Sequence, residues 1–172
     1  MLKLNLPLDK DSVKKLRAGD SVLISGTIYT ARDCAHKRLT DMLAKGEPLP
    51  FDLNGAFIYY AGPCPAKPNF ASGSCGPTTS ARMDAYAPTL LDAGLGGMLG
   101  KGEMSEEVRQ ALMRNCGVYF AAFGGAGALY GKAIKDSKLI AFPELLSEAV
   151  RKLEVTDFPA VVAIDCYGNS IY

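Results

Sequence analysis

The sequence has no Cys-x-x-Cys pair and only one histidine, so it lacks the ligand spacing of most zinc sites and many iron–sulfur sites. Its cysteines stand far apart, at Cys34, Cys64, Cys75, Cys116 and Cys166. We expect most of them to be reduced, buried small residues, although a ligand role for Cys64 and Cys75 is an alternative. The sequence therefore predicts no metal bound by this chain alone.

Long apolar runs are also missing. The uncharged stretch at residues 117–131 is shorter than the roughly 18 apolar residues of a membrane helix and contains five glycines. The first residues, MLKLNLPLDKDSVKK, alternate apolar and polar side chains and lack the apolar core of a signal peptide. We therefore expect no membrane span and a cytoplasmic location.

A strong charge of one sign is absent too. The 19 Lys and Arg residues nearly balance the 18 Asp and Glu residues, and the formal net charge is +1. Because the sequence indicates neither a basic surface nor an acidic tail, we expect small anions or protein surfaces as partners, and no nucleic acid. A length of 172 residues fits one domain, residues 1–172.

Two familiar phosphate-binding motifs are incomplete. Ala126 and Ala133 stand where a Walker loop around Gly131-Lys132 needs a glycine and a hydroxyl residue. Leu99 stands where the third glycine of a dinucleotide-binding pattern would be. Nucleotide binding is therefore an alternative that the sequence does not favour.

What the sequence does contain is a dense set of small and hydrogen-bonding residues at 71–84, ASGSCGPTTSARMD. Its glycines allow the backbone to approach a ligand closely. Thr78 or Thr79 is predicted to cap a helix that carries Arg82. Pro88 is predicted to bend or break this helix. Free N–H groups at a helix start favour an anion, and a guanidinium can bind a carboxylate through two hydrogen bonds. The segment predicts an anion site, with an ordinary capped loop as the alternative.

Strand and helix patterns alternate along the chain, which predicts the α/β class with a mixed, partly parallel sheet. Asp33 is predicted to cap the helix that follows a strand at residues 22–30. Ligands of such sheets usually lie beyond the carboxyl ends of the strands. The candidate residues all belong to such ends: Arg32, Thr78, Thr79, Arg82 and Lys101.

Several strings of the sequence together resemble one family. They are GTIYTARDCAHKRL at 26–39, FIYYAGP at 57–63, GPTTSARMD at 76–84 and DFPAVVAIDCYGN at 157–169. In this order they resemble the C-terminal domain of class I fumarases, which is a separate beta subunit in two-component enzymes. Beta subunits of L-tartrate dehydratases share both arginine-containing motifs, so the resemblance is less specific for the substrate than for the family.

The resemblance implies a compact, swivelling β/β/α domain of a hydro-lyase that is active only with its alpha subunit. In this family the active site lies between the two parts, and cysteines of the alpha subunit hold a [4Fe–4S] cluster. The residues that match Arg32, Thr78, Arg82 and Lys101 contact the substrate, and the match to Thr79 is a proposed base. We therefore expect Thr79, Arg82 and Lys101 to be catalytic.

His36 and Asp33 are further candidates because they lie in the first of these strings. A lone histidine beside Arg and Lys is more often a hydrogen-bonded structural group than a catalyst. The predicted function is reversible hydration of fumarate to L-malate, with the alpha subunit and a small dicarboxylate as partners and with dimerisation. The beta subunit of L-tartrate dehydratase and a non-catalytic anion-binding module are the alternatives.

Overall fold

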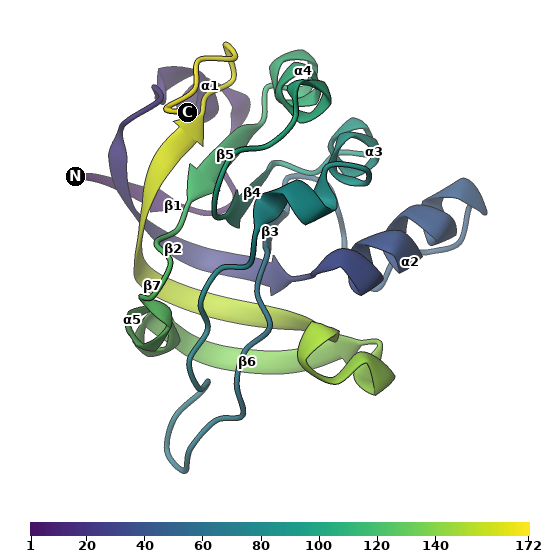
Figure 1. The fold of residues 1–172 in the computed structure, drawn as a ribbon, viewed down its shortest axis with the longest axis vertical. Coiled ribbons are helices and arrows are strands. Elements are labelled where there is room, and N and C mark those ends of the chain that lie inside the picture. Colours follow the sequence, from purple (N-terminus) through teal and green to yellow (C-terminus); the bar gives the residue numbers. More distant parts are fainter.

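Seven strands form one mixed sheet in the computed structural model, which describes all residues from Met1 to Tyr172 (Figure 1). The strands are β1 (Leu2–Asn5), β2 (Ser21–Thr30), β3 (Phe57–Tyr59), β4 (Gly97–Gly100), β5 (Val118–Ala121), β6 (Ile134–Ala141) and β7 (Val150–Ile164). The α-helices are α1 (Lys10–Lys15), α2 (Asp33–Ala44), α3 (Ala87–Asp92), α4 (Glu106–Asn115) and α5 (Gly127–Ala133). Two 3₁₀ helices complete the chain, η1 (Ser80–Met83) and η2 (Pro143–Glu148). The predicted α/β class with a partly parallel sheet is confirmed.

The sheet closes on itself through its last strand. Strands β1 to β5 pair in parallel, each with the next, whereas β7 pairs antiparallel with β6, β5 and β2. Since β7 bonds to both β2 and β5, the strands β2, β3, β4, β5 and β7 form a continuous ring. The parallel strands of this ring end at a common edge.

The ring separates two apolar cores. Alternate residues of a strand point to opposite faces, so Phe57 and Tyr59 of β3 join an inner cluster to which every strand of the ring contributes. Ile58 and Tyr60 point outward into a second cluster, which α2, α3 and α4 cover on one side of the sheet (Figure 1). The outer cluster therefore lies directly beneath the helices that follow the parallel strands.

Helix ends follow the sequence in part. Ser105 caps α4, because its side chain accepts a hydrogen bond from the N–H of Val108. Two predictions were wrong. Asp33 is the first residue of α2, whose N-cap is Arg32 without a side-chain bond, and Pro88 lies in the first turn of a separate helix, α3. Proline is well tolerated there because a first-turn N–H has no partner within the helix.

Candidate active site

The candidate residues gather where four parallel strands end. Arg32 follows β2, and Lys101 follows β4 directly. Backbone hydrogen bonds continue the sheet just past the strand ends: Ala31 N–H to Tyr59 O (3.2 Å), Tyr60 N–H to Leu99 O (2.8 Å) and Ala122 N–H to Gly100 O (2.7 Å). The strand order therefore brings these turns to one edge, as the sequence predicted.

The GPTTSARMD motif returns to this edge after a long loop that extends from the body of the molecule (Figure 1). Pro77 forms a bridge with Ala61, and the N–H of Thr78 donates to Tyr60 O at 2.7 Å. Thr79 then pairs with Lys101 in an isolated parallel bridge. The motif thus adds a short extended segment between the ends of β3 and β4.

The predicted helix start is different in the structure. Residues 80–83 form only the 3₁₀ helix η1, and Thr79 is its N-cap without a side-chain hydrogen bond. The N–H groups of Thr78 and Ser80 already donate to the carbonyls of Tyr60 and Lys101, at 2.7 and 2.9 Å. The prediction that Thr78 or Thr79 caps the helix with its side chain was therefore wrong, because bridging to the sheet uses the backbone groups instead. An anion at this edge would depend on side-chain cations.

Two such cations are exposed and unpaired. Thr79, Arg82 and Lys101 are exposed, whereas Arg32 and Thr78 are half-buried. The side chains of Arg82 and Lys101 form no ion pair or hydrogen bond within the chain. The Lys101 Nζ lies 4.0 Å from the position that a Cβ would take at Gly124, which follows β5. Both charges are thus free to bind an anion beside Thr79.

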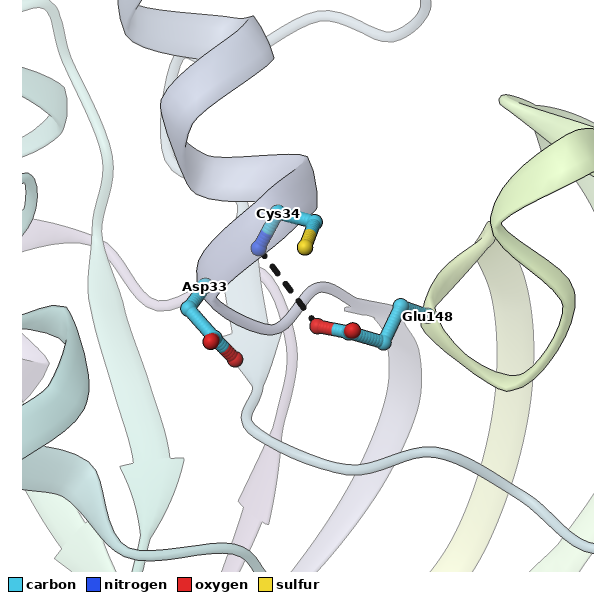
Figure 2. Close-up of side chains that lie close together, drawn as sticks. All are labelled: Asp33, Cys34 and Glu148. Atoms are coloured by element: carbon cyan, nitrogen blue, oxygen red, sulfur yellow. Dashed lines mark hydrogen bonds between the residues drawn. The ribbon is translucent and has the colours of Figure 1, made fainter.

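Arg32 has one acidic neighbour. Its Nε lies 3.9 Å from Glu148 Oε1, and the same oxygen accepts a 3.4 Å hydrogen bond from the N–H of Cys34 (Figure 2). Its Nη1 lies 3.4 Å from the position of a Cβ at Gly62, just beyond β3. Glu148 therefore holds the guanidinium and the first turn of α2 together, while the guanidinium reaches toward the neighbouring strand end.

Asp33, Cys34 and Glu148 come together around this first turn. Their ligand atoms lie within 4.8 Å of one another, and Figure 2 shows the Cys34 sulfur near Glu148 with Asp33 on the other side of the turn. The Glu148 carboxylate raises the pKa of the exposed Cys34 thiol, because it accepts a hydrogen bond from the thiol and carries a negative charge nearby. Because Glu148 already interacts with Arg32 and the Cys34 N–H, the cluster is accounted for by contacts within the chain.

His36 lies inside the protein, away from solvent. It is fully buried, its Nδ1 lies 2.9 Å from Arg32 O, and its ring meets the edge of Tyr60 at a centroid distance of 5.1 Å. Burial lowers the pKa of His36 to about 4. The imidazole is therefore neutral at pH 7 and supports the carbonyl end of Arg32.

The cysteines of this chain do not fit an iron–sulfur cluster. All five are free, and only two of them are exposed. The one group of metal-binding side chains that the structure brings together contains a single thiol, Cys34. Because a [4Fe–4S] cluster is held by several cysteine thiolates, the cysteines of this chain do not form a site for one.

The main cavities do not include the candidate side chains. Arg32, Thr79, Arg82 and Lys101 line none of four cavities of about 210, 420, 480 and 730 Å³, although Ala81 and Asp84 of the GPTTSARMD motif line the cavity of about 480 Å³. The candidate residues thus form an open edge. None of the helices combines the length and apolar character needed to cross a bilayer.

Comparison with known proteins gives the family. The sequence model described as "Fumarase C-terminus" matches residues 1–172. Fumarate hydratase 2 of Leishmania major is 41% identical over 173 residues, which cover 98% of this chain and 30% of that protein. Aerobic class I fumarate hydratase of Salmonella typhimurium is 37% identical, again over 98% of this chain and 30% of the relative.

A relative of similar length has a different name. A Methanocaldococcus jannaschii protein provisionally named L(+)-tartrate dehydratase subunit beta is 44% identical over 171 residues, covering 96% of this chain and 88% of the relative. The chain thus spans about a third of the fumarate hydratases that it matches. The match over all 172 residues, together with these relatives, shows that the chain belongs to the Fumarase C-terminus family.

Proposed function

We propose that this chain is the beta subunit of a two-component class I fumarase, which interconverts fumarate and L-malate in the cytoplasm. The name of one relative supports a separate subunit, because the protein named as a beta subunit is 44% identical to this chain, which covers 88% of that protein. The remaining part of the enzyme would then be an alpha subunit.

The observation that carries the proposal is the set of cations at the strand edge. Arg82 and Lys101 are exposed and unpaired beside Thr79, and Arg32 follows the adjacent part of the sheet. Fumarate and malate each have two carboxylates, so an enzyme that orients them needs cationic groups for both ends. Guanidinium groups suit carboxylates because they donate two parallel hydrogen bonds, and Lys101 adds a compact positive charge.

The threonines would handle substrate contact and proton transfer. Thr78 is half-buried beside the exposed Thr79. A threonine hydroxyl is a weak base on its own, so Thr79 would require an activating carboxylate, which we assign to the partner. In hydration, Thr79 would transfer a proton to one alkene carbon, while the hydroxyl group derived from water is added to the other carbon.

A partner would also change the electrostatics of this edge. Two unit charges 4 Å apart interact by about 1 kcal/mol in water but by about 4 kcal/mol at an effective dielectric constant near 20. Exposed Arg82 and Lys101 would therefore hold a dicarboxylate more tightly once a second chain covers them. A [4Fe–4S] cluster of the alpha subunit would supply a Lewis acid for the hydroxyl group.

L-tartrate dehydratase is the second candidate, favoured by the name of the relative of which the chain covers 88%. Tartrate also has two carboxylates, so the same cations would suit it. Discrimination between malate and tartrate would depend on the residues around the additional hydroxyl of tartrate, some of which the alpha subunit would contribute.

The test is co-expression with the alpha subunit, anaerobic purification, and comparison of turnover with L-malate and L-tartrate. We expect kcat/KM for malate and fumarate to exceed that for tartrate. A higher value for tartrate would establish the second candidate. Binding of dicarboxylates without turnover of either substrate would indicate a non-catalytic anion-binding module.

A further inference from the structure

A buried hydrogen-bonded pair lies directly beneath the candidate active site. The hydroxyls of Ser80 and Tyr119 are 2.8 Å apart, and the Tyr119 hydroxyl donates to Gly102 O at 2.8 Å. Ser80 and Tyr119 are both fully buried. These two bonds link η1, β5 and the turn after β4, which are distant in sequence.

The direction of the two bonds follows from their protons. A tyrosine hydroxyl has one proton, and Tyr119 uses it for Gly102 O, so Ser80 must donate to Tyr119. Burial raises the pKa of Tyr119, which keeps this proton in place across the physiological range. Each bond therefore has a defined donor and acceptor.

The fold leaves space for this pair. Gly100, the last residue of β4, faces Ser80, and a Cβ at this position would overlap the Ser80 Oγ and come within 2.8 Å of Tyr60 Cδ2. Only glycine allows the serine to pack against the strand. A buried polar pair with its own space in the sheet contrasts with the apolar residues of the surrounding outer cluster.

The linked residues are the chain neighbours of two candidate catalytic groups. Ser80 directly follows Thr79, and Gly102 directly follows Lys101. The Ser80 N–H also donates to Lys101 O at 2.9 Å. A shift of either turn would therefore move a hydroxyl or an ammonium group at the open edge.

We propose that Tyr119 and Ser80 are positioning residues that fix the Thr79 turn against the Lys101 turn, an inference that rests on the proposed function. Neither residue is exposed to substrate, so both act through their neighbours. Displacement of a reacting group by about 1 Å can cost up to 10²-fold in rate.

The first test is kinetic and uses the anaerobic complex with the alpha subunit. Tyr119→Phe keeps the ring and removes the hydroxyl, and we expect kcat per folded molecule to fall roughly tenfold, with a smaller change in KM. Ser80→Ala should lower kcat in the same direction. The kcat of the double variant should be no more than about twofold lower than that of Tyr119→Phe, because the two substitutions break the same connection.

The matched control is Tyr59→Phe. Tyr59 is equally buried, and its hydroxyl donates to Cys75 O at 2.7 Å on the other face of the sheet. We expect a similar loss of thermal stability but unchanged kcat. If Tyr119→Phe and Ser80→Ala also retain normal kcat at temperatures where they are folded, the proposed positioning role is overturned.

A second measurement separates this inference from the proposed function. Amide hydrogen exchange in the full chain should become at least about threefold faster in both residues 79–83 and residues 101–104 of Tyr119→Phe, and in neither segment of Tyr59→Phe. An inactive wild-type complex would overturn the proposed function, while the exchange data would still support or overturn the link between the turns. Unchanged hydrogen exchange in both segments of Tyr119→Phe would overturn the proposed link between the two turns.

Discussion

Thr79 and Lys101 lie side by side in a parallel bridge, although one ends a long loop and the other directly follows β4. The bridge aligns the backbones of an exposed threonine and an exposed, unpaired lysine, with the unpaired Arg82 three residues beyond Thr79. The candidate site thus combines a hydroxyl group with two cations, and each of these groups has an expected effect on catalysis.

The two arginines should depend on their planar shape. Arg82→Lys keeps the charge but loses the pair of parallel hydrogen bonds. We therefore expect kcat/KM of the complex to fall, by an amount that corresponds to a loss of about 1.5–3 kcal/mol in transition-state binding. Arg32→Lys should behave similarly. Arg38→Lys is the control, since Arg38 lies further along α2 and pairs with Glu144 of η2. Near-normal kcat/KM in the Arg82 and Arg32 variants would show that these guanidinium groups are structural.

Thr79 should matter through its hydroxyl and not through helix capping. Its side chain forms no cap bond, so Thr79→Val should change the melting temperature little. If the hydroxyl transfers a proton, Thr79→Val should lower kcat by roughly 10²-fold or more with a smaller effect on KM. Thr79→Ser should retain substantial activity, and Thr89→Val at an exposed position of α3 should retain all of it. Normal turnover of Thr79→Val would place the base elsewhere, such as on the partner.

Glu148 should control the reactivity of Cys34 in the isolated chain. Its hydrogen bond and charge raise the pKa of the Cys34 thiol, which lowers the thiolate fraction at pH 8. Glu148→Gln should therefore speed alkylation of Cys34 by iodoacetamide, measured by peptide mapping. Glu144→Gln removes an acid from the same 3₁₀ helix and should leave the rate unchanged. Equal rates in the two variants would mean that Glu148 does not act on the thiol.

His36 should make stability depend on pH. Burial lowers its pKa from 6.5 to about 4, so between these values the unfolded chain binds more protons than the folded chain. The free energy of unfolding should fall as the pH decreases from about 6.5 to about 4, by up to about 3 kcal/mol from this group. Denaturant unfolding at several pH values measures the loss. Since His36 is the only histidine, its NMR signal can be followed directly, and titration near pH 6.5 would contradict this account.

Carboxyl groups should affect the free energy of unfolding in a lower pH range than His36. Hydrogen bonds from Arg114 lower the pKa of Asp92, and those from Arg109 lower the pKa of Glu106. Their stabilisation is present above the ordinary carboxyl pKa and is lost as the pH falls through the lowered value. These surface groups therefore do not account for a loss of stability between pH 6.5 and 5.

The sequence predicted much of the fold because several signals are local. Ser105 followed by two acidic residues is typical of a helix start, and α4 begins there, while glycines at positions 46 and 94 follow α2 and α3 with positive φ angles. Arg32 and Lys101 were correctly expected just after strands, because alternation of strands and helices fixes which ends of parallel strands meet.

The rest depended on contacts between distant parts of the chain. The long strand β7 contains Pro159 and a positive φ at Asp157, both unfavourable signals for a strand, yet pairing with β2 holds it extended. Glu148 was missed because nothing local links it to Arg32. The capping prediction for the threonines failed because pairing of Thr79 with Lys101 replaces helix geometry by sheet geometry.

The most direct measurement of the central claim is fumarate hydration by this chain, by the alpha subunit and by an anaerobic mixture of the two. The account predicts that the isolated chain is folded, colourless and inactive, and that activity rises with added alpha subunit until the two reach a fixed ratio. Visible iron–sulfur absorption by this chain alone, or fumarate hydration without the alpha subunit, would contradict it.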